Sequence, residues 1–237
     1  IAAIFLETIV GTNGILIPPD GYIQGVRELC DRHGILMVAD EVMAGFGRTG
    51  KWFAIEHWDT VPDLLTMAKG LTSSYLPLGA VAMRRKIADA FETKMFFGGL
   101  TYSSHPVSCA AALATIGVYE EDGLIENSAT LGKAMRRHHE DLYDRHPSLG
   151  AHRNLGLFGI LDLVRSREPY EPLTPFNGTS DEMKAIGKHF REHGLYAMIA
   201  NNSIHTNPPL CITEEQLGDG FAIIDAALDI ADQAVTG

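Results

Sequence analysis

The chain has 237 residues, 46% of them hydrophobic and 21% charged, which is the composition of a folded globular protein and excludes disordered and fibrous classes. Its formal net charge of −11 argues against nucleic acid as a general partner, because phosphate binding needs clustered lysines and arginines. Its apolar runs are far shorter than the roughly 20 residues that a helix needs to cross a bilayer, so we expect no membrane partner.

The first part of the chain predicts a strand, a helix and a second strand. Residues 2–6 form an apolar run without a lead-in or an initiating methionine, so we expect residues upstream in the complete protein. A Pro-Pro-Asp-Gly turn opens a helix over 21–33, whose apolar residues recur at helical spacing, and Gly34 is suited to its C-cap. Residues 35–39 are continuously apolar, as in a parallel sheet covered on both faces. This order predicts a right-handed crossover.

The middle of the chain continues the same pattern. Apolar runs predict strands over 64–68 and 78–83, and helices follow over 106–121 and 124–146. These elements predict an α/β fold with a mostly parallel sheet and helices on both faces. We expect them to form one domain, residues 1–147.

The pattern changes in the last third of the chain, where short strands and helices mix. We expect a small α+β domain over 148–237. Residues 156–164 alternate weakly between apolar and other residues, and the predicted elements are short strands over 195–199 and 203–206 and helices over 181–192 and 213–234. The last helix opens on Thr-Glu-Glu-Gln, which fits a capping box.

The cysteines bear on where the protein resides. Cys30, Cys109 and Cys211 are odd in number and lack the spacing of metal ligands. Reduced thiols in a cytoplasmic protein are the interpretation that fits this pattern.

Two polar residues follow buried strands and suggest a chemistry. Asp40 lies at the carboxyl end of one predicted strand, which is where open α/β sheets hold ligands, and Lys69 directly follows another. Pyridoxal phosphate needs a lysine for its aldehyde and a nearby anion that keeps its ring nitrogen protonated. The pair therefore favours a pyridoxal phosphate enzyme.

One long motif resembles the signature of the class III, or ω-type, aminotransferases, which are fold type I pyridoxal phosphate enzymes: VADEVMAGFGRTGKWFAIEHWDTVPDLLTMAKG. The resemblance extends through GTNGILIPPDGY, LPLGAVAM, GLTYSSHPVSCAAALA and NPPLCITEEQL. It therefore covers essentially the whole chain. The family's upstream half, with its phosphate-binding turn and a stacking aromatic residue, has no counterpart here.

The resemblance implies a role for four residues. Lys69 matches the lysine that forms the Schiff base and later moves the substrate proton. Asp40 matches the carboxylate that pairs with the ring nitrogen, and Val42 the aliphatic residue packed on one ring face. Thr101 matches a hydroxyl presented to the cofactor phosphate of a neighbouring subunit. The resemblance thus implies a homodimer whose partners complete each other's sites.

Two further pocket residues mark departures within the family. Glu7 matches a glutamate that, in the ornithine and 4-aminobutyrate branches, pairs with an arginine before the Pro-Pro-Leu segment. No arginine follows Arg191, so that clamp for a substrate carboxylate is missing. Met43 replaces a glutamine of the same branches. The resemblance therefore implies an ω-amine or amino acid donor and a 2-oxo acid acceptor, with pyruvate favoured.

Other functions remain open. Residues 45–50 are a literal GxGxxG, which would suit a NAD-dependent dehydrogenase, but that motif must directly follow a strand and open a helix. Here four residues separate it from Asp40, and residues 51–59 are too short and aromatic for that helix. His189 and His193 have a spacing that can bind zinc, although we expect an ordinary surface helix. An aminomutase or decarboxylase of the same fold, or a non-catalytic dimerising fragment, completes the alternatives.

Overall fold

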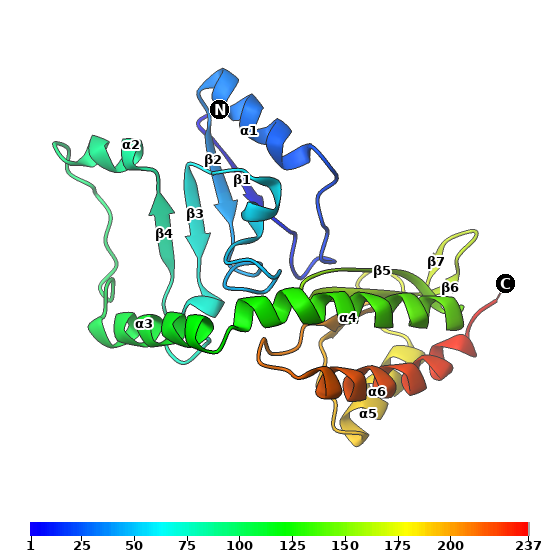
Figure 1. Ribbon diagram of the computed structural model, residues 1–237. Coiled ribbons are helices and arrows are strands. Elements are labelled where there is room, and N and C mark those ends of the chain that lie inside the picture. The colour runs from blue at the N-terminus through cyan, green and yellow to red at the C-terminus, as the bar shows by residue number, and fades with distance from the viewer. Residues whose placement is uncertain (237) are drawn as a thin grey trace. The chain divides into compact units, whose positions relative to one another are not determined.

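The computed structural model describes residues 1–236 (Figure 1). The chain divides into two compact units, the first over residues 1–126 and the second beginning at Asn127. The division falls inside helix α4 (Leu124–Arg145), whereas the sequence predicts a boundary at the other end of this helix. Most of α4 belongs with the second unit because it packs against that unit's sheet. The assignment of residues 1–147 to one cofactor-binding domain stays a prediction.

The first unit contains a four-stranded sheet in the order β1-β2-β3-β4 (Figure 1). Strands β1 (Ala3–Glu7), β2 (Leu36–Asp40) and β3 (Leu64–Met67) run parallel, and β4 (Ala80–Met83) is antiparallel to β3. The mostly parallel sheet predicted from the sequence is therefore confirmed. Because β1, β2 and β3 are parallel, their carboxyl ends meet at one edge of the sheet.

One face of this sheet is covered by helix α1 (Tyr22–His33) and the short helix η1 (Ala54–Trp58). Their core residues are buried together with Met37 of β2: Ile23, Cys30 and Ile55. Gly34 caps α1 with φ 64°, a conformation that glycine adopts without strain, and its amide donates to the carbonyl of Cys30. The predicted C-cap is therefore confirmed. On the opposite face Phe5 is 75% exposed within the described chain.

A buried carboxylate holds the start of β3 to its surroundings. Asp63 is 1% exposed and accepts from the amide of Met37 at 3.0 Å, from Arg27 at 2.8 Å and from Lys86 at 2.9 Å. Burial alone would raise the pKa of Asp63, but the amide and the two cations together hold it well below its usual value. Asp63 therefore stays ionised and links three elements.

The rest of the first unit follows β3. Helix η2 (Lys69–Leu71) comes directly after the strand, and α2 (Arg85–Ala88) and η3 (Asp89–Phe91) follow β4. Helix α3 (Pro106–Glu121) has the bounds that the sequence predicts. It buries Ser108, Ala112 and Tyr119 on one side, at helical spacing.

The second unit is built on an antiparallel sheet in the order β5-β6-β9-β8, with β7 paired to β6. The strands are β5 (Leu149–Leu155), β6 (Phe158–Ser166), β7 (Glu171–Pro172), β8 (Ile199–Ala200) and β9 (Ser203–Thr206). Helices α5 (Asp181–Glu192) and α6 (Glu214–Asp232) pack against each other. At the start of α6, Thr213 and Gln216 exchange two hydrogen bonds, so the predicted capping box is confirmed.

One strand of this sheet was not predicted, and another was misplaced. β5 was not predicted because polar side chains fill its centre: Arg153 pairs with Asp162 at 2.7 Å, and Asn154 donates to the carbonyl of Gly132. A strand over 195–199 was expected, but only its last residue is in β8. The amide of Leu195 instead donates to Phe190 and extends the end of α5.

No helix in the described part of the chain is long and apolar enough to cross a membrane.

Candidate active site

The sheet register brings Asp40 and Lys69 to the same edge. Asp40 is the last residue of β2 and pairs in register with Thr66 of the adjacent parallel strand β3. Lys69 follows three residues later, just beyond the end of β3, and its side chain is exposed. Neighbouring parallel strands thus deliver the carboxylate and the amine to one end of the sheet.

The carboxylate of Asp40 is held in place by its own turn. Its Oδ1 accepts from the amide of Val42 at 2.9 Å, which leaves the other oxygen for a further donor. Val42 is half-buried beside it. The sequence-predicted neighbours Asp40 and Val42 are therefore joined directly.

The backbone of Lys69 adopts an unusual conformation. Its φ of 43° lies in the left-handed region, which costs a non-glycine residue about 1 kcal/mol or more and persists only where the surroundings enforce it. The turn is closed by hydrogen bonds from the amides of Leu71 to Ala68 at 3.0 Å and of Ser73 to Gly70 at 3.3 Å. Strain at this residue type and place is typical of a functional site.

Glu7 and Met43 meet at Gly11. Glu7 pairs in register with Asp40, and its Oε2 accepts from the amide of Gly11 at 2.8 Å. The sulfur of Met43 packs where a side chain on residue 11 would project. The structure therefore places Glu7, Asp40 and Met43 at the same end of the sheet.

Thr101 is the predicted residue that the structure does not join to these. It lies exposed in the turn before α3, and within the described residues no hydrogen bond connects it to Asp40 or Lys69. Asn201 and Asn202 lie in the turn between β8 and β9, where Asn202 donates to the carbonyl of Leu163 at 2.8 Å. This bond ties the turn to β6.

Glu41 is a supporting residue to which the sequence analysis assigned no role. Its side chain is fully buried and accepts from Thr8 at 2.7 Å and from the amides of Ala54 and Ile55 at 2.9 and 2.8 Å. Burial raises the pKa of Glu41, and these three hydrogen bonds oppose that shift. The sequence shows that Asp40 and Glu41 are adjacent, but it does not show which of the two side chains is buried. Glu41 therefore fixes the path of the chain after β2, the strand that carries Asp40.

One buried hydroxyl beside Asp40 lacks a partner. Thr66 Oγ1 is buried and has no hydrogen bond to any described residue. Because Thr66 and Asp40 are register partners, their side chains leave the sheet on the same face. Unpaired buried hydroxyls are uncommon in folded proteins, so this one suits a site that takes up a polar ligand.

The glycine loop does not have the geometry of a dinucleotide fingerprint. Gly45 donates to the carbonyl of Glu41 at 3.0 Å, inside a turn rather than at the end of a strand. The segment after Gly50 leads into η1, a short 3₁₀ helix that begins at Ala54. The α-helix whose N-terminus would hold a pyrophosphate is absent from this fully described segment.

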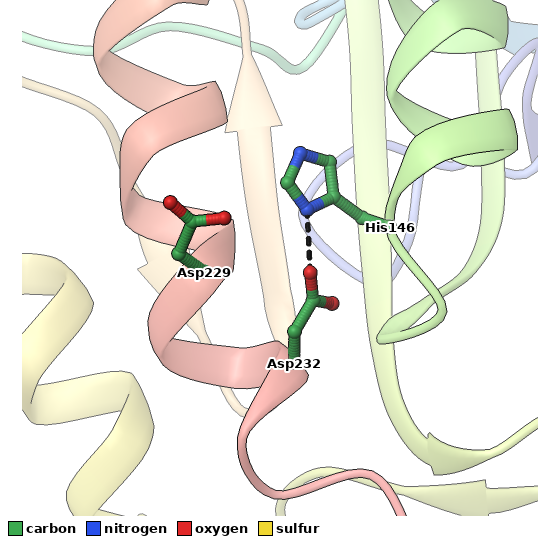
Figure 2. A group of neighbouring side chains, drawn as sticks. All are labelled: His146, Asp229 and Asp232. Carbon is green, nitrogen blue, oxygen red and sulfur yellow. Dashed lines mark hydrogen bonds and ion pairs between the residues drawn. The ribbon is translucent and has the colours of Figure 1, made fainter.

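Two groups of residues outside this site contain histidine and resemble metal-binding patterns. The rings of His189 in α5 and of His193, the residue after that helix, stack with centroids 4.0 Å apart, and Nδ1 of His193 bonds the carbonyl of His189. Elsewhere His146, Asp229 and Asp232 lie close enough to hold a metal ion (Figure 2). The sequence analysis did not single out this group.

Protein partners already occupy the ligand atoms of His146. Its Nδ1 is bonded to Asp232, the contact that Figure 2 marks with a dashed line. That distance is 2.7 Å, and Nε2 lies 2.7 Å from Asp225. The other oxygen of Asp232 accepts from the hydroxyl of Ser148 at 2.6 Å. These contacts tie the end of α4 to α6.

Comparison with known proteins identifies the family. The sequence model described as aminotransferase class-III matches residues 1–228. The chain belongs to the class III aminotransferase family. Its relatives in that family include the putrescine–pyruvate aminotransferase of Pseudomonas aeruginosa, 35% identical over 99% of this chain and 51% of that protein. The omega-aminotransferase of Caulobacter vibrioides is 40% identical over 92% of this chain and 48% of that protein.

Solved structures agree with this class III assignment. Taurine:2-oxoglutarate aminotransferase from Bifidobacterium kashiwanohense, solved in complex with PLP and glutamate, superposes with a TM-score of 0.94 at 39% identity. The match covers 99% of this chain and 52% of that one. The predicted fold type I architecture is therefore confirmed. The chain spans about half the length of the curated relatives it matches.

Proposed function

We propose that this chain belongs to a pyridoxal-phosphate-dependent aminotransferase that moves an amino group from an ω-amine or amino acid to a 2-oxo acid. The observation that carries the proposal is the register of β2 and β3, which brings Asp40 and Lys69 to one edge of the sheet. The supporting observation is membership of the class III family over residues 1–228. This chain thus supplies part of the proposed active site.

The residues at this edge fit the cofactor. Bound pyridoxal phosphate supplies an aldehyde that condenses with amines and a ring that accepts electrons. The Asp40 carboxylate, with one oxygen unclaimed by its turn, would hold a proton on the ring nitrogen. Lys69 would carry the cofactor and, once its amine is released, take and return the proton at the substrate carbon. Val42 would pack against one ring face, and the unpaired Thr66 hydroxyl gives the pocket a further polar group.

The exposed position of Thr101 supports the proposal that the enzyme is a dimer. The Thr101 side chain is exposed in the turn before α3, and no hydrogen bond to a described residue joins it to Asp40 or Lys69. We infer that Thr101 reaches the cofactor phosphate of a second subunit, so that a homodimer forms the complete sites. A Thr101→Ala enzyme that holds phosphate as tightly as the parent would refute this role. We place the enzyme in the cytoplasm.

The substrate proposal depends on Glu7 and Met43. Glu7 is bound to the amide of Gly11 at 2.8 Å, so its carboxylate has a partner in the absence of an arginine clamp. Met43 adds an apolar surface next to Gly11. A pocket without the clamp favours donors recognised by an amine and an apolar stem, and a small acceptor such as pyruvate. Relatives named for pyruvate and for 2-oxoglutarate both occur, so the acceptor has to be measured.

Absorbance and labelling test the proposed reaction. The complete enzyme should show a visible band with pyridoxal phosphate, and borohydride reduction should place a pyridoxyl group on Lys69 in peptide mass spectra. Lys69→Ala should abolish both, whereas the control Lys188→Ala, an exposed α5 lysine, should keep both. A donor screen with pyruvate and 2-oxoglutarate in competition then assigns the acceptor. A parent enzyme without the band and the label would refute the aminotransferase proposal.

A further inference from the structure

A buried tyrosine reaches the turn that carries Lys69. Tyr119 of α3 is 7% exposed, and its hydroxyl donates to the carbonyl of Gly70 at 2.9 Å. The hydrogen bond spans 49 residues of sequence and joins α3 to η2. The helix therefore holds the peptide that directly follows the lysine.

The ring of Tyr119 is fixed independently of its hydroxyl. It stacks on Phe46 with ring centroids 6.0 Å apart and meets Trp52 edge-on, also at 6.0 Å. Burial raises the pKa of Tyr119, against the opposing effect of Arg48, so the hydroxyl keeps its proton and acts as a donor. An aromatic ring held on two sides gives the hydroxyl a defined direction.

The turn at Lys69 needs such a restraint. The left-handed φ of 43° is unfavourable for lysine, and the local amide bonds within the turn include one of 3.3 Å to the same Gly70 carbonyl. The hydroxyl of Tyr119 adds a bond to this carbonyl at a shorter distance, 2.9 Å. Local and long-range bonds thus converge on one oxygen, next to a strained residue.

We propose that Tyr119 is a positioning residue for Lys69: through the Gly70 carbonyl it keeps the lysine backbone in the strained turn and so directs the side-chain amine. The inference rests on the proposed role of Lys69. Its hydroxyl acts through the Gly70 carbonyl and not by contact with cofactor or substrate. It acts by narrowing the conformations that the Lys69 backbone can adopt before the amine condenses with an aldehyde, a step that releases one water.

The experiment compares Tyr119→Phe with the parent and with Tyr196→Phe, which removes a hydroxyl from a side chain that is 96% exposed. Pyridoxal phosphate is added to each apoenzyme at a temperature where all are folded. The growth of the visible band gives the rate, and borohydride labelling counts modified Lys69. Hydrogen exchange of the amides of residues 72 and 73 reports on the turn without any cofactor.

We expect Tyr119→Phe to form the band about tenfold more slowly and to exchange the two amides about tenfold faster, as fits the loss of one buried hydrogen bond. Tyr196→Phe should match the parent in both. A Tyr119→Phe protein that melts at a lower temperature but matches the parent in rate and in exchange at these amides would overturn the inference, because the hydroxyl would then serve stability alone. Failure of the parent itself to label Lys69 would instead refute the proposed function.

Discussion

Replacing Gly70 by alanine tests how tightly the lysine turn is packed. A Cβ at residue 70 would lie 2.7 Å from the Cβ of Phe46 and 3.2 Å from two of its ring carbons. Carbon atoms at rest are roughly 3.5–4.0 Å apart, so one side must move by about 1 Å. Phe46 is only 4% exposed and has φ 56°, which leaves it little freedom to move. Overpacking of this kind costs about 1–3 kcal/mol, and we expect Gly70→Ala to lower the free energy of unfolding by about 2 kcal/mol.

Gly79→Ala is the matched control in the same unit. Its added Cβ would meet only the carbonyl oxygen of Met67 at 3.6 Å, an ordinary contact. We expect a change within about 0.5 kcal/mol, in the range of surface substitutions. Urea unfolding followed by tryptophan fluorescence suits the comparison, because both tryptophans, Trp52 and Trp58, lie in the first unit. Equal stability of the two variants would show that the turn has room, and would refute the reasoning.

Further substitutions probe two buried carboxylates of the first unit and the packing of the second. Asp63→Asn should lower the free energy of unfolding by about 3 kcal/mol at pH 7, because it removes the buried anion that pairs with the largely buried Arg27 and with Lys86. The pKa of Asp63 is lowered by folding, so this difference from the parent should persist above pH 3.8 and shrink as the pH falls further, measured by urea unfolding. The pKa of Glu41 is raised by folding, so the parent should lose stability relative to Glu41→Gln as the pH rises above 4.5, measured in the same way. Gly132→Ala should destabilise the second unit by about 2 kcal/mol, because its Cβ would lie 2.6 Å from the carbonyl carbon of Gly156 in the facing hairpin. The control Gly218→Ala in α6 meets no atom within 4 Å and should stabilise the unit by about 1 kcal/mol. Circular dichroism melts measure both.

Particular results would contradict these expectations. An Asp63→Asn penalty that grows on acidification would mean that the carboxylate is not ionised in the folded protein. A stability difference for Glu41→Gln that is flat between pH 4 and pH 7 would mean that Glu41 titrates alike in the folded and unfolded states. Stabilisation of Gly132→Ala by as much as Gly218→Ala would show that α4 does not approach the hairpin closely.

The sequence predicts those parts of the site that depend on local order. Asp40 and Lys69 follow continuous apolar strands, and parallel strands of this kind end at a shared edge, so their convergence follows from pattern and topology. The capping box at Thr213 is also predictable from local sequence, because its two hydrogen bonds join residues three apart. Helix α3 also has its predicted bounds, since Pro106 fixes its first turn.

The rest depends on partners distant in sequence. Tyr119 looks like one more residue of a small-residue helix until its hydroxyl is found on a carbonyl 49 positions away. His146 is bonded to carboxylates 79 and 86 residues away, which no spacing rule connects. The polar residues at the centre of β5 do not predict a strand, because Arg153 and the side-chain nitrogen of Asn154 bind partners that only the folded chain brings near.

Asp40 and Glu41 show how one short segment can both offer and support a functional group. Successive residues at the end of a strand point to opposite sides, so one carboxylate faces the proposed pocket while the next is buried. Glu41 then binds Thr8 beyond β1 and the first amides of η1, which fixes the path of the chain on both sides of Asp40. On the lysine strand, Tyr119 and Phe46 hold the peptide after Lys69 in the same manner. Each proposed reacting group is thus held by a buried contact made one residue away, which lets the side chain itself remain free for chemistry.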